Sequence, residues 1–420
     1  MKNFWQELHK PFFVLAPMAG VTDQPFRLMC KKFTADVLYS EMVSSEAIWH
    51  NRLNSKFKTL NPKQIRNYNY QNNKQLLKTL ELIRFSKIER PFVVQIFGSN
   101  PEHMAYAAEY IATGEWYKDY QKIRNLNFET RNNIKNIISN DKKYFGFCAS
   151  DFEILSIPNG IDINMGCPAR DVVKTGAGSA LIKNQENAIK IIKAIKKKVK
   201  NIPVSVKTRL GWSNPDEILE FSKKLENAGV NAIAIHGRTY KQKFSGKADW
   251  SNIYKVKKML KIPVIGNGGI VNFEDVGNVR YVQIVQKLQL QQVKRLNNFN
   301  NLNIPLDGIM IGQGALGKPW LFEELKKQFL ISKSEILNND LNSNNNKNKI
   351  INNPKAKIQK LKTIILQHAK LVDKFKGQEG FKEFRKHFAW YFKDQPNSKK
   401  IRSKLNQINS LDDVKDILKN

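Results

Sequence analysis

The chain has 420 residues, a formal net charge of +33 and a pI near 9.9. This length can hold one large hydrophobic core and an appended domain. So large an excess of positive charge indicates a polyanionic partner. Because no basic amphipathic anchor stands out, nucleic acid is favoured over a membrane surface. No apolar stretch approaches the roughly 18 residues that a membrane-spanning helix requires, so we expect no membrane association.

The three cysteines, Cys30, Cys148 and Cys167, show no C-x-x-C spacing. An odd number without such spacing predicts a reduced protein with no zinc finger, and we expect no bound metal. The first 20 residues superficially resemble a signal peptide, but Glu7 and His9 interrupt them and the apolar run is short. We therefore expect a cytoplasmic protein, and we expect it to be a monomer.

Eight short apolar runs recur along the chain, each ending in Gly, Pro or polar residues, and segments of helical periodicity lie between them. The runs cover residues 12–16, 36–39, 92–96, 160–164, 203–206, 232–235, 262–265 and 308–311. Clear helical segments include residues 188–199 and 216–228. Eight β/α alternations predict a (β/α)8 TIM barrel. A doubly wound sheet is the alternative, but the G-x-G-x-x-G fingerprint that usually follows its first strand is missing.

The domain organisation follows from composition. Residues 1–332 would form the barrel, with Asn- and Lys-rich insertions near 52–80, 115–150 and 278–303, the last containing an extra amphipathic helix over 279–296. Residues 333–354 are of low complexity and predict a linker. Residues 355–420 predict a smaller all-helical domain. From residue 351 onward the chain has 17 Lys and Arg against 7 Asp and Glu, with Trp390 and Tyr391 interleaved, which favours RNA or DNA binding.

The chemistry is expected where the strands end, because barrel enzymes place their active sites at that face. The fourth strand is followed by Met165, Gly166, Cys167 and Pro168, which bring a thiol to this face. A buried structural cysteine in a turn is the simpler alternative. The glycine-rich segments 266–269 and 312–314 follow the seventh and eighth strands and predict a phosphate cradle. A phosphate-bearing cofactor such as a flavin would follow, with Gln95, Lys207 and His236 around it.

These residues lie in motifs that resemble the tRNA-dihydrouridine synthase family of flavin-dependent TIM-barrel enzymes. The similar segments are residues 16–23 (APMAGVTD), 94–98 (VQIFG), 162–168 (DINMGCP), 206–209 (VKTR), 236–239 (HGRT), 245–250 (SGKADW), 267–270 (NGGI) and 314–317 (GALG), together with 384–391 in the tail. The resemblance covers nearly the whole chain apart from the Asn- and Lys-rich insertions. It implies tightly bound FMN, NADPH or NADH as the reductant, and tRNA as the substrate.

The resemblance also implies roles for single residues. The predicted FMN contacts are the backbone of Pro17, Met18 and Ala19, the ring-holding Gln95 and Lys207, His236 at the ribityl–phosphate tail, and the phosphate cradle of Asn267, Gly268, Gly269, Gly312 and Gln313. Asn164 and Arg209 would face the target uracil. Cys167 would be the proton donor. Two positions depart from the family pattern: Gln313 stands where Arg is usual, and Phe244 where an aromatic hydroxyl is common.

The residues suit this chemistry on their own terms. Reducing the C5=C6 bond of uracil requires a hydride at C6 and a proton at C5, and a thiol holds its proton at neutral pH yet releases it readily. Lys207 would stabilise the anionic reduced ring. Two alternatives remain open: a flavin barrel such as dihydroorotate dehydrogenase that reduces or oxidises a free base, and an RNA-binding protein built on a decayed barrel. The first has no use for a basic tail, and the second has no use for Cys167 and Lys207.

Overall fold

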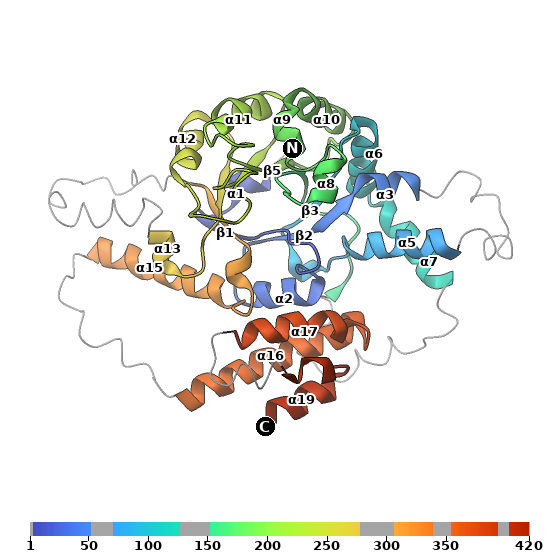
Figure 1. The fold of residues 1–420 in the computed structure, drawn as a ribbon, viewed down its shortest axis with the longest axis vertical. Helices are drawn as coiled ribbons and strands as arrows, with labels where there is room; N and C mark the ends of the chain where they lie inside the picture. Colours follow the sequence, from blue (N-terminus) through green and yellow to red (C-terminus); the bar gives the residue numbers. More distant parts are fainter. Residues whose placement is uncertain are drawn as a thin grey trace. The chain divides into compact units, whose positions relative to one another are not determined.

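Eight parallel strands close into a barrel in the order β1 to β8, with β1 pairing β8 (Figure 1). The computed structural model describes residues 3–51, 70–126, 152–277, 306–338, 354–393 and 403–419. The strands are β1 (Phe12–Leu15), β2 (Val37–Ser44), β3 (Phe92–Phe97), β4 (Gly160–Met165), β5 (Val204–Arg209), β6 (Ala232–His236), β7 (Val264–Asn267) and β8 (Gly308–Ile311). The predicted (β/α)8 barrel and all eight strands are confirmed.

Six strands extend past their predicted ends, β3 and β4 by one residue each. β5 continues through Arg209, β6 through His236 and β7 through Asn267, because ladder pairing persists where the apolar pattern stops. A mouth-facing polar residue ends the hydrophobic run without ending the strand. β2 reaches Ser44 after a register shift between Tyr39 and Met42, so its predicted end at residue 39 was wrong. The polar residues expected in loops therefore sit on rigid strands.

Alternate residues of the strands face the barrel interior, as a period of two requires. The interior apolar cluster consists of Trp5, Phe12, Val14, Ala16, Val37, Tyr39, Val93, Ala232, Ala234, Ile265 and Met310. Trp5 comes from the short helix α1 (Phe4–Glu7) and is fully buried, with its ring 5.8 Å from that of Phe12 and 6.4 Å from that of Tyr39. On β3, β4 and β5 the interior positions nearer the carboxyl ends become polar, which leaves that end of the barrel for chemistry.

Helices that follow the strands surround the barrel (Figure 1). They are α3 (Ser45–His50), α5 (Tyr70–Glu81), α6 (Pro101–Ala112), α7 (Glu115–Leu126), α8 (Arg170–Lys174), α9 (Ala180–Lys183), α10 (Gln185–Lys198), α11 (Glu217–Asn227) and α12 (Ser251–Met259), with the 3-10 turn η2 (Lys87–Glu89). The Asn184 side chain caps α10 by accepting from the Asn187 N–H, and lysines fill its last turn. α11 ends before Gly229, whose φ of +98° suits a helix stop. Both helices match their predicted segments.

The predicted insertions are partly helical. α5 begins inside the 52–80 insertion, and α7 occupies the start of the 115–150 insertion. The rest of these two segments, and the 278–303 insertion with its expected helix at 279–296, lie outside the described residues.

The chain divides into two compact units, and the second consists of residues 23–35, 270–275 and 312–420. Its helices are α2 (Gln24–Lys32), α15 (Leu321–Asn338), α16 (Pro354–Lys376), α17 (Gly380–Tyr391) and α19 (Leu411–Lys419), with η7 (Gln313–Ala315) and η8 (Leu405–Gln407); α13 (Phe273–Gly277) begins in this unit. The helical C-terminal region is confirmed. We call this second unit the helical unit.

The helical unit differs from the predicted domain limits in two ways. It includes α2, whose residues Gln24–Cys30 are all buried and whose Phe26 ring lies 4.9 Å from the ring of His387 on α17. It also includes residues 312–332, which the sequence assigned to the barrel. The predicted linker 333–354 begins inside α15, and its residues 339–353 lie outside the described chain. Over the described residues, no helix has both the length and the apolar character needed to span a membrane.

Candidate active site

Asn164 connects the barrel interior to the loop that carries Cys167. Its Nδ2 donates to Gln95 Oε1 at 2.9 Å and approaches Met42 Sδ at 3.5 Å. Its Oδ1 accepts from the backbone N–H groups of Gly166 at 3.1 Å and Cys167 at 2.9 Å. The amide therefore has partners on both its nitrogen and its oxygen. Asn164 was predicted to face the uracil, and here its amide holds the loop after β4.

Asp162 lies one layer deeper on the same face of β4 and is fully buried. Its carboxylate accepts from Gln95 Nε2 at 2.8 Å, from Ser205 Oγ at 2.6 Å and from the Tyr39 hydroxyl at 3.5 Å. Burial raises the pKa of Asp162 to about 6, although these hydrogen bonds and the Lys207 charge oppose the rise. Gln95 is thereby fixed between Asp162 and Asn164.

Sequence reasoning missed the roles of Asp162, Tyr39 and Ser205. One signal was present, because Asp162 and Asn164 alternate with Ile161 and Ile163 and so must share the inner face of β4.

Three cations gather at the carboxyl ends of β5 and β6: Lys207, Arg209 and Arg238. Burial, and secondarily the Arg209 charge, lowers the pKa of Lys207 to about 8. Within the described part of the chain, the Lys207 ammonium has no hydrogen-bond or salt-bridge partner. A partly buried cation without an anionic contact is costly to keep. Lys207 thus offers a positive charge to a ligand.

Arg209 is almost fully buried, with 3% of its surface exposed, and it supports two loops. Its Nε donates to the Gly166 carbonyl at 2.7 Å, and its Nη1 donates to the carbonyls of Thr239 at 3.2 Å and Lys243 at 2.7 Å. The guanidinium carbon lies 5.4 Å from the centroid of the Phe244 ring, which is 57% exposed. Arg209 was predicted to contact the uracil. In the structure it ties the Cys167 loop to the loop after β6.

His236 ends β6 and is 9% exposed, and its Nδ1 is buried with no hydrogen-bond partner in the structure. Burial, together with the charges of Lys207, Arg209 and Arg238, lowers its pKa to about 2. The ring is therefore a neutral imidazole at physiological pH. A buried polar nitrogen without a partner is unfavourable unless a ligand supplies one.

The glycine loop after β7 lies beside His236. Gly268 has a φ of +119°, and a Cβ there would lie 3.4 Å from His236 Nε2 and 3.1 Å from the Ala248 Cβ. Gly269 has a φ of +78°, and a Cβ there would meet only Ala248, at 3.7 Å. Asn267 uses its Nδ2 to donate to the Met310 carbonyl at 2.7 Å. The loop thus presents backbone without side chains next to His236, as a phosphate or ribityl chain requires.

The segment after β1 is partly engaged in its own turn. Met18 donates its backbone N–H to Thr22 Oγ1 at 3.1 Å, and its carbonyl accepts from Thr22 as well. Pro17 and Met18 are half-buried and Ala19 is exposed. These residues are accessible as predicted, but the Met18 N–H already has a partner.

Cys167 is half-buried in the loop between β4 and α8. Its carbonyl accepts from the Ser179 N–H at 3.1 Å, and Gly178, with a φ of +60°, passes so close that a Cβ there would lie 2.9 Å from that carbonyl. Both ends of the Cys167 backbone are thus held in place. Over the described residues, no carboxylate or imidazole is hydrogen-bonded to its sulfur. The thiol is positioned but lacks the adjacent base that would activate a nucleophile.

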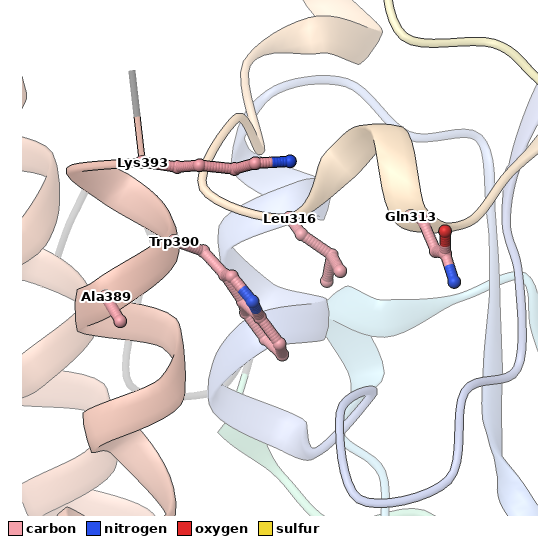
Figure 2. A pocket seen from close by; sticks show the side chains of 5 residues that line it. All are labelled: Gln313, Leu316, Ala389, Trp390 and Lys393. Carbon is pink, nitrogen blue, oxygen red and sulfur yellow. The ribbon is translucent and has the colours of Figure 1, made fainter. Parts of the chain in front are cut away.

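Gly312 and Gln313 belong to the helical unit, where Gln313 lines a cavity of about 480 Å³. Figure 2 shows Trp390, Lys393 and Leu316 pointing into this space, with Gln313 at its edge and Ala389 beside Trp390. Proteins that bind single-stranded nucleic acid combine such groups: an aromatic ring such as an indole for stacking, a cation such as an ammonium, and polar groups such as an amide. The predicted cradle that joins Gly312 and Gln313 to the loop after β7 stays a prediction.

The arrangement at the mouth of the barrel fits a phosphorylated ring cofactor. Four features occur together there: the half-buried Cys167 thiol on a fixed loop, the unpaired Lys207 ammonium, the buried His236 imidazole with a free nitrogen, and the glycine loop after β7. Of the predicted residues, Asn164, Gln95 and Cys167 are linked by hydrogen bonds, and Lys207, Arg209 and His236 interact electrostatically.

Comparison with known families matches this chain to dihydrouridine synthase (Dus) over residues 14–128, 118–284 and 294–420. Among curated proteins, tRNA-dihydrouridine synthase B of Pasteurella multocida is 32% identical over 390 residues, covering 91% of this chain and 84% of its own. The proteins of the same name from Vibrio vulnificus and Xanthomonas axonopodis pv. citri are 30% and 28% identical, each over 411 residues. The first alignment covers 94% of this chain and 91% of the relative, and the second covers 96% and 90%. The matched stretches include Cys167, Lys207 and His236.

Proposed function

We propose that this chain, which belongs to the dihydrouridine synthase family, reduces the C5=C6 bond of uridines in tRNA. FMN would be its redox cofactor, and NADPH or NADH the reductant. The tRNA-dihydrouridine synthase activity rests on the family match. The cofactor and the residue roles rest on the groups at the barrel mouth.

Lys207, His236 and the loop Asn267–Gly269 would hold the FMN. The unpaired Lys207 ammonium suits an electron-rich ring edge, and the free His236 Nδ1 suits a polar group of the ribityl–phosphate tail. Gln95, clamped between Asp162 and Asn164, would present its amide edge to the ring. FMN, when bound, supplies the hydride that C6 of the uracil accepts.

Cys167 would donate the proton to C5. Its loop is fixed by Asn164 and Arg209, which places the thiol at a set position relative to Gln95 and Lys207. Positioned general acids contribute on the order of 10²–10⁴ in rate. Asn164 and Arg209 would act through the loop, as positioning residues.

The helical unit would bind the tRNA. Of the 33 excess positive charges of the chain, 10 lie after residue 350, a sixth of its length. The cavity lined by Trp390 and Lys393 can accept an unstacked base and a phosphate. The target uridine must leave its stack to reach the barrel mouth, which a loop nucleotide does at least cost.

The observation that supports the function best is the coexistence of the fixed Cys167 thiol with the unpartnered Lys207 and His236. The test is to incubate the purified protein with FMN, NADPH and an unmodified tRNA transcript, and to search the digested tRNA for dihydrouridine by mass spectrometry. We expect dihydrouridine at one or a few positions and none without FMN. Reduction of free uracil or orotate, with no product in tRNA, would instead support the free-base alternative.

A further inference from the structure

The helices α3 and α6 lie side by side (Figure 1), and three side chains of types that can ligate a metal ion converge between them. Glu46 and His50 come from α3 and His103 from α6. Both oxygens of the Glu46 carboxylate lie 2.8 Å from His103 Nδ1, and one lies 3.3 Å from His50 Nε2. The three ligand atoms all fall within 4.8 Å of one another.

The local structure holds these side chains in place. Glu46 and His50 are four residues apart and so share one face of α3. The start of α3 is capped by Ser44, which accepts from the Ala47 N–H, and that of α6 by Asn100, which accepts from the His103 N–H at 3.2 Å. The two helix starts are packed closely, because a Cβ on Gly98 would lie 2.1 Å from Ser45 Oγ.

His103 is the most constrained of the three. Its ring stacks on Trp49, with centroids 4.3 Å apart and planes 19° apart, and its side chain is 15% exposed. His50 is 68% exposed, which leaves one side of the cluster open to water. The His103 ring would thus be the fixed ligand, and the more exposed Glu46 and His50 side chains have room to close around an ion.

We propose that Glu46, His50 and His103 bind a divalent transition-metal ion of the zinc class. Two imidazoles and one carboxylate favour zinc and its neighbours over magnesium or calcium, which prefer oxygen ligands. Tetrahedral zinc with bonds of about 2.0–2.1 Å separates its ligand atoms by roughly 3.3 Å. The two distances to the Glu46 carboxylate, 2.8 and 3.3 Å, would therefore change by about half an ångström or less, and the distance between the two imidazole nitrogens, at most 4.8 Å, by up to about 1.5 Å. Water would take the open position.

Metal binding fixes which ring nitrogen of His103 carries the proton. Coordination through Nδ1 requires His103 to carry its proton on Nε2, so the hydrogen bond that His103 can make to Glu46 is replaced by two bonds to the ion. The ion would cross-link the segments that follow β2 and β3. Those strands carry Met42 and Gln95, which both contact the Asn164 amide, so the bound ion would stabilise that side of the barrel mouth.

The alternative is that His103 and Glu46 form only a partly exposed polar pair, which contributes little to stability. The two cases differ in their response to zinc. Of the other four histidines, His236, His368 and His387 are buried, and His9 is the exposed one, so a His9 variant serves as the control.

The experiment uses the full chain, freed of metal with a chelator and titrated with Zn²⁺ against a chromophoric competitor, and with Co²⁺ for its visible absorption. We expect one equivalent to bind and to raise the melting temperature. His50→Gln changes an exposed side chain and should keep the fold while weakening zinc at least about 10–100-fold, and His103→Gln should weaken it at least as much. His9→Gln and Cys167→Ala are matched controls and should bind zinc as the wild type does.

Two outcomes would overturn the proposal. One is wild-type protein that takes up no zinc or cobalt at concentrations well above those of the protein. The other is zinc affinity that survives both His50→Gln and His103→Gln or that disappears in either control.

Discussion

The barrel mouth and the helical unit each bury a group of charged residues, and the two groups are built differently. In the helical unit the Lys376 ammonium lies 3.0 Å from Asp23 Oδ2 and also contacts Glu383. Burial alone would raise the pKa of Asp23, but the charges of Lys376, His387 and His368 lower it to about 2. Asp23, Lys376 and Glu383 thus each have an opposite charge in contact.

At the barrel mouth the charges are mostly of one sign. The positive charge of Arg209 repels those of Lys207 and Arg238, and the pKa of Lys207 falls to about 8 because of its burial and the nearby Arg209. Asp162 is the carboxylate that acts on Lys207, but it is shared among three hydrogen-bond donors. Removing one partner of a buried charge pair is strongly destabilising, whereas an unpaired buried charge in a cleft is a candidate for ligand binding. The same residue type should therefore respond differently to substitution in the two regions.

The largest difference is expected between the two described cysteines, one in each region. Cys167→Ala should bind FMN and accept electrons from NADPH as the wild type does, yet reduce tRNA about 10²–10⁴ times more slowly, because no acid remains at C5. Rapid mixing of the reduced protein with tRNA measures this rate. Cys30→Ala, in fully buried surroundings on α2, should lose some stability and keep the rate. An unchanged rate in Cys167→Ala would remove Cys167 from the mechanism.

The next effect is on folding. Lys376→Met leaves the buried Asp23 without its cation and should lower the free energy of unfolding by about 2–4 kcal/mol. Denaturant unfolding of the flavin-free protein measures it. Asp412→Ala breaks an exposed pair with Lys415 and should change stability by less than about 0.5 kcal/mol. Equal effects from the two variants would mean that burial of the Asp23 pair is unimportant.

Lys207→Met makes the same chemical change at the barrel mouth and should act in the opposite direction. We expect FMN to bind about 10–100-fold more weakly, because a charge-assisted contact is lost. Without flavin, the variant should be more stable than the wild type by about 1–3 kcal/mol, because burial of an unpaired cation is relieved. Flavin titration and denaturant unfolding provide the two measurements.

The stability gain of Lys207→Met should depend on pH. The folded-state pKa of Lys207, about 8, lies below its ordinary value of 10.5, so the unfolded chain binds the extra proton between these values. Wild-type stability therefore rises with pH across this range. The advantage of the variant should be complete below about pH 8 and absent by about pH 10.5. A pH-independent difference would show that packing, not charge, is responsible.

The smallest effect concerns the surface of the helical unit. Lys393→Ala removes the ammonium at the cavity beside Trp390 and should reduce the slope of log affinity for tRNA against log salt by about 1. Lys415→Ala, on α19 and paired with Asp412, is the matched control and should leave the slope unchanged. Identical slopes for both variants would place the tRNA elsewhere.

The sequence predicts the barrel well because each strand carries its own apolar pattern. It predicts strand ends poorly. On β5 the apolar run ends before Lys207, yet the pairing of β5 with β6 continues to Arg209, which lies opposite His236. The sequence does not predict the hydrogen bonds of Asp162 with Tyr39 and Ser205, because partners so far apart in sequence meet only through barrel register.

Pairings between helices are hidden from the sequence for a related reason. The amphipathic pattern of α2 predicts a buried face but does not say that the face belongs with α16 and α17. The spacing of Glu46 and His50 is visible on α3, whereas the approach of His103 depends on how α3 packs against α6.

The affiliation of α2 has a consequence for how the protein is made. Its buried face, with Phe26 at the centre, belongs to a unit whose main helices begin at Pro354, more than 300 residues later. At synthesis rates of about 5–20 residues per second, α2 waits for roughly a quarter of a minute to a minute before its partners leave the ribosome. During that interval an apolar helix face is exposed on the nascent chain. Truncation near residue 354 would make that exposure permanent, so we expect the truncated chain to aggregate, whether or not the C-terminal helices also bind tRNA.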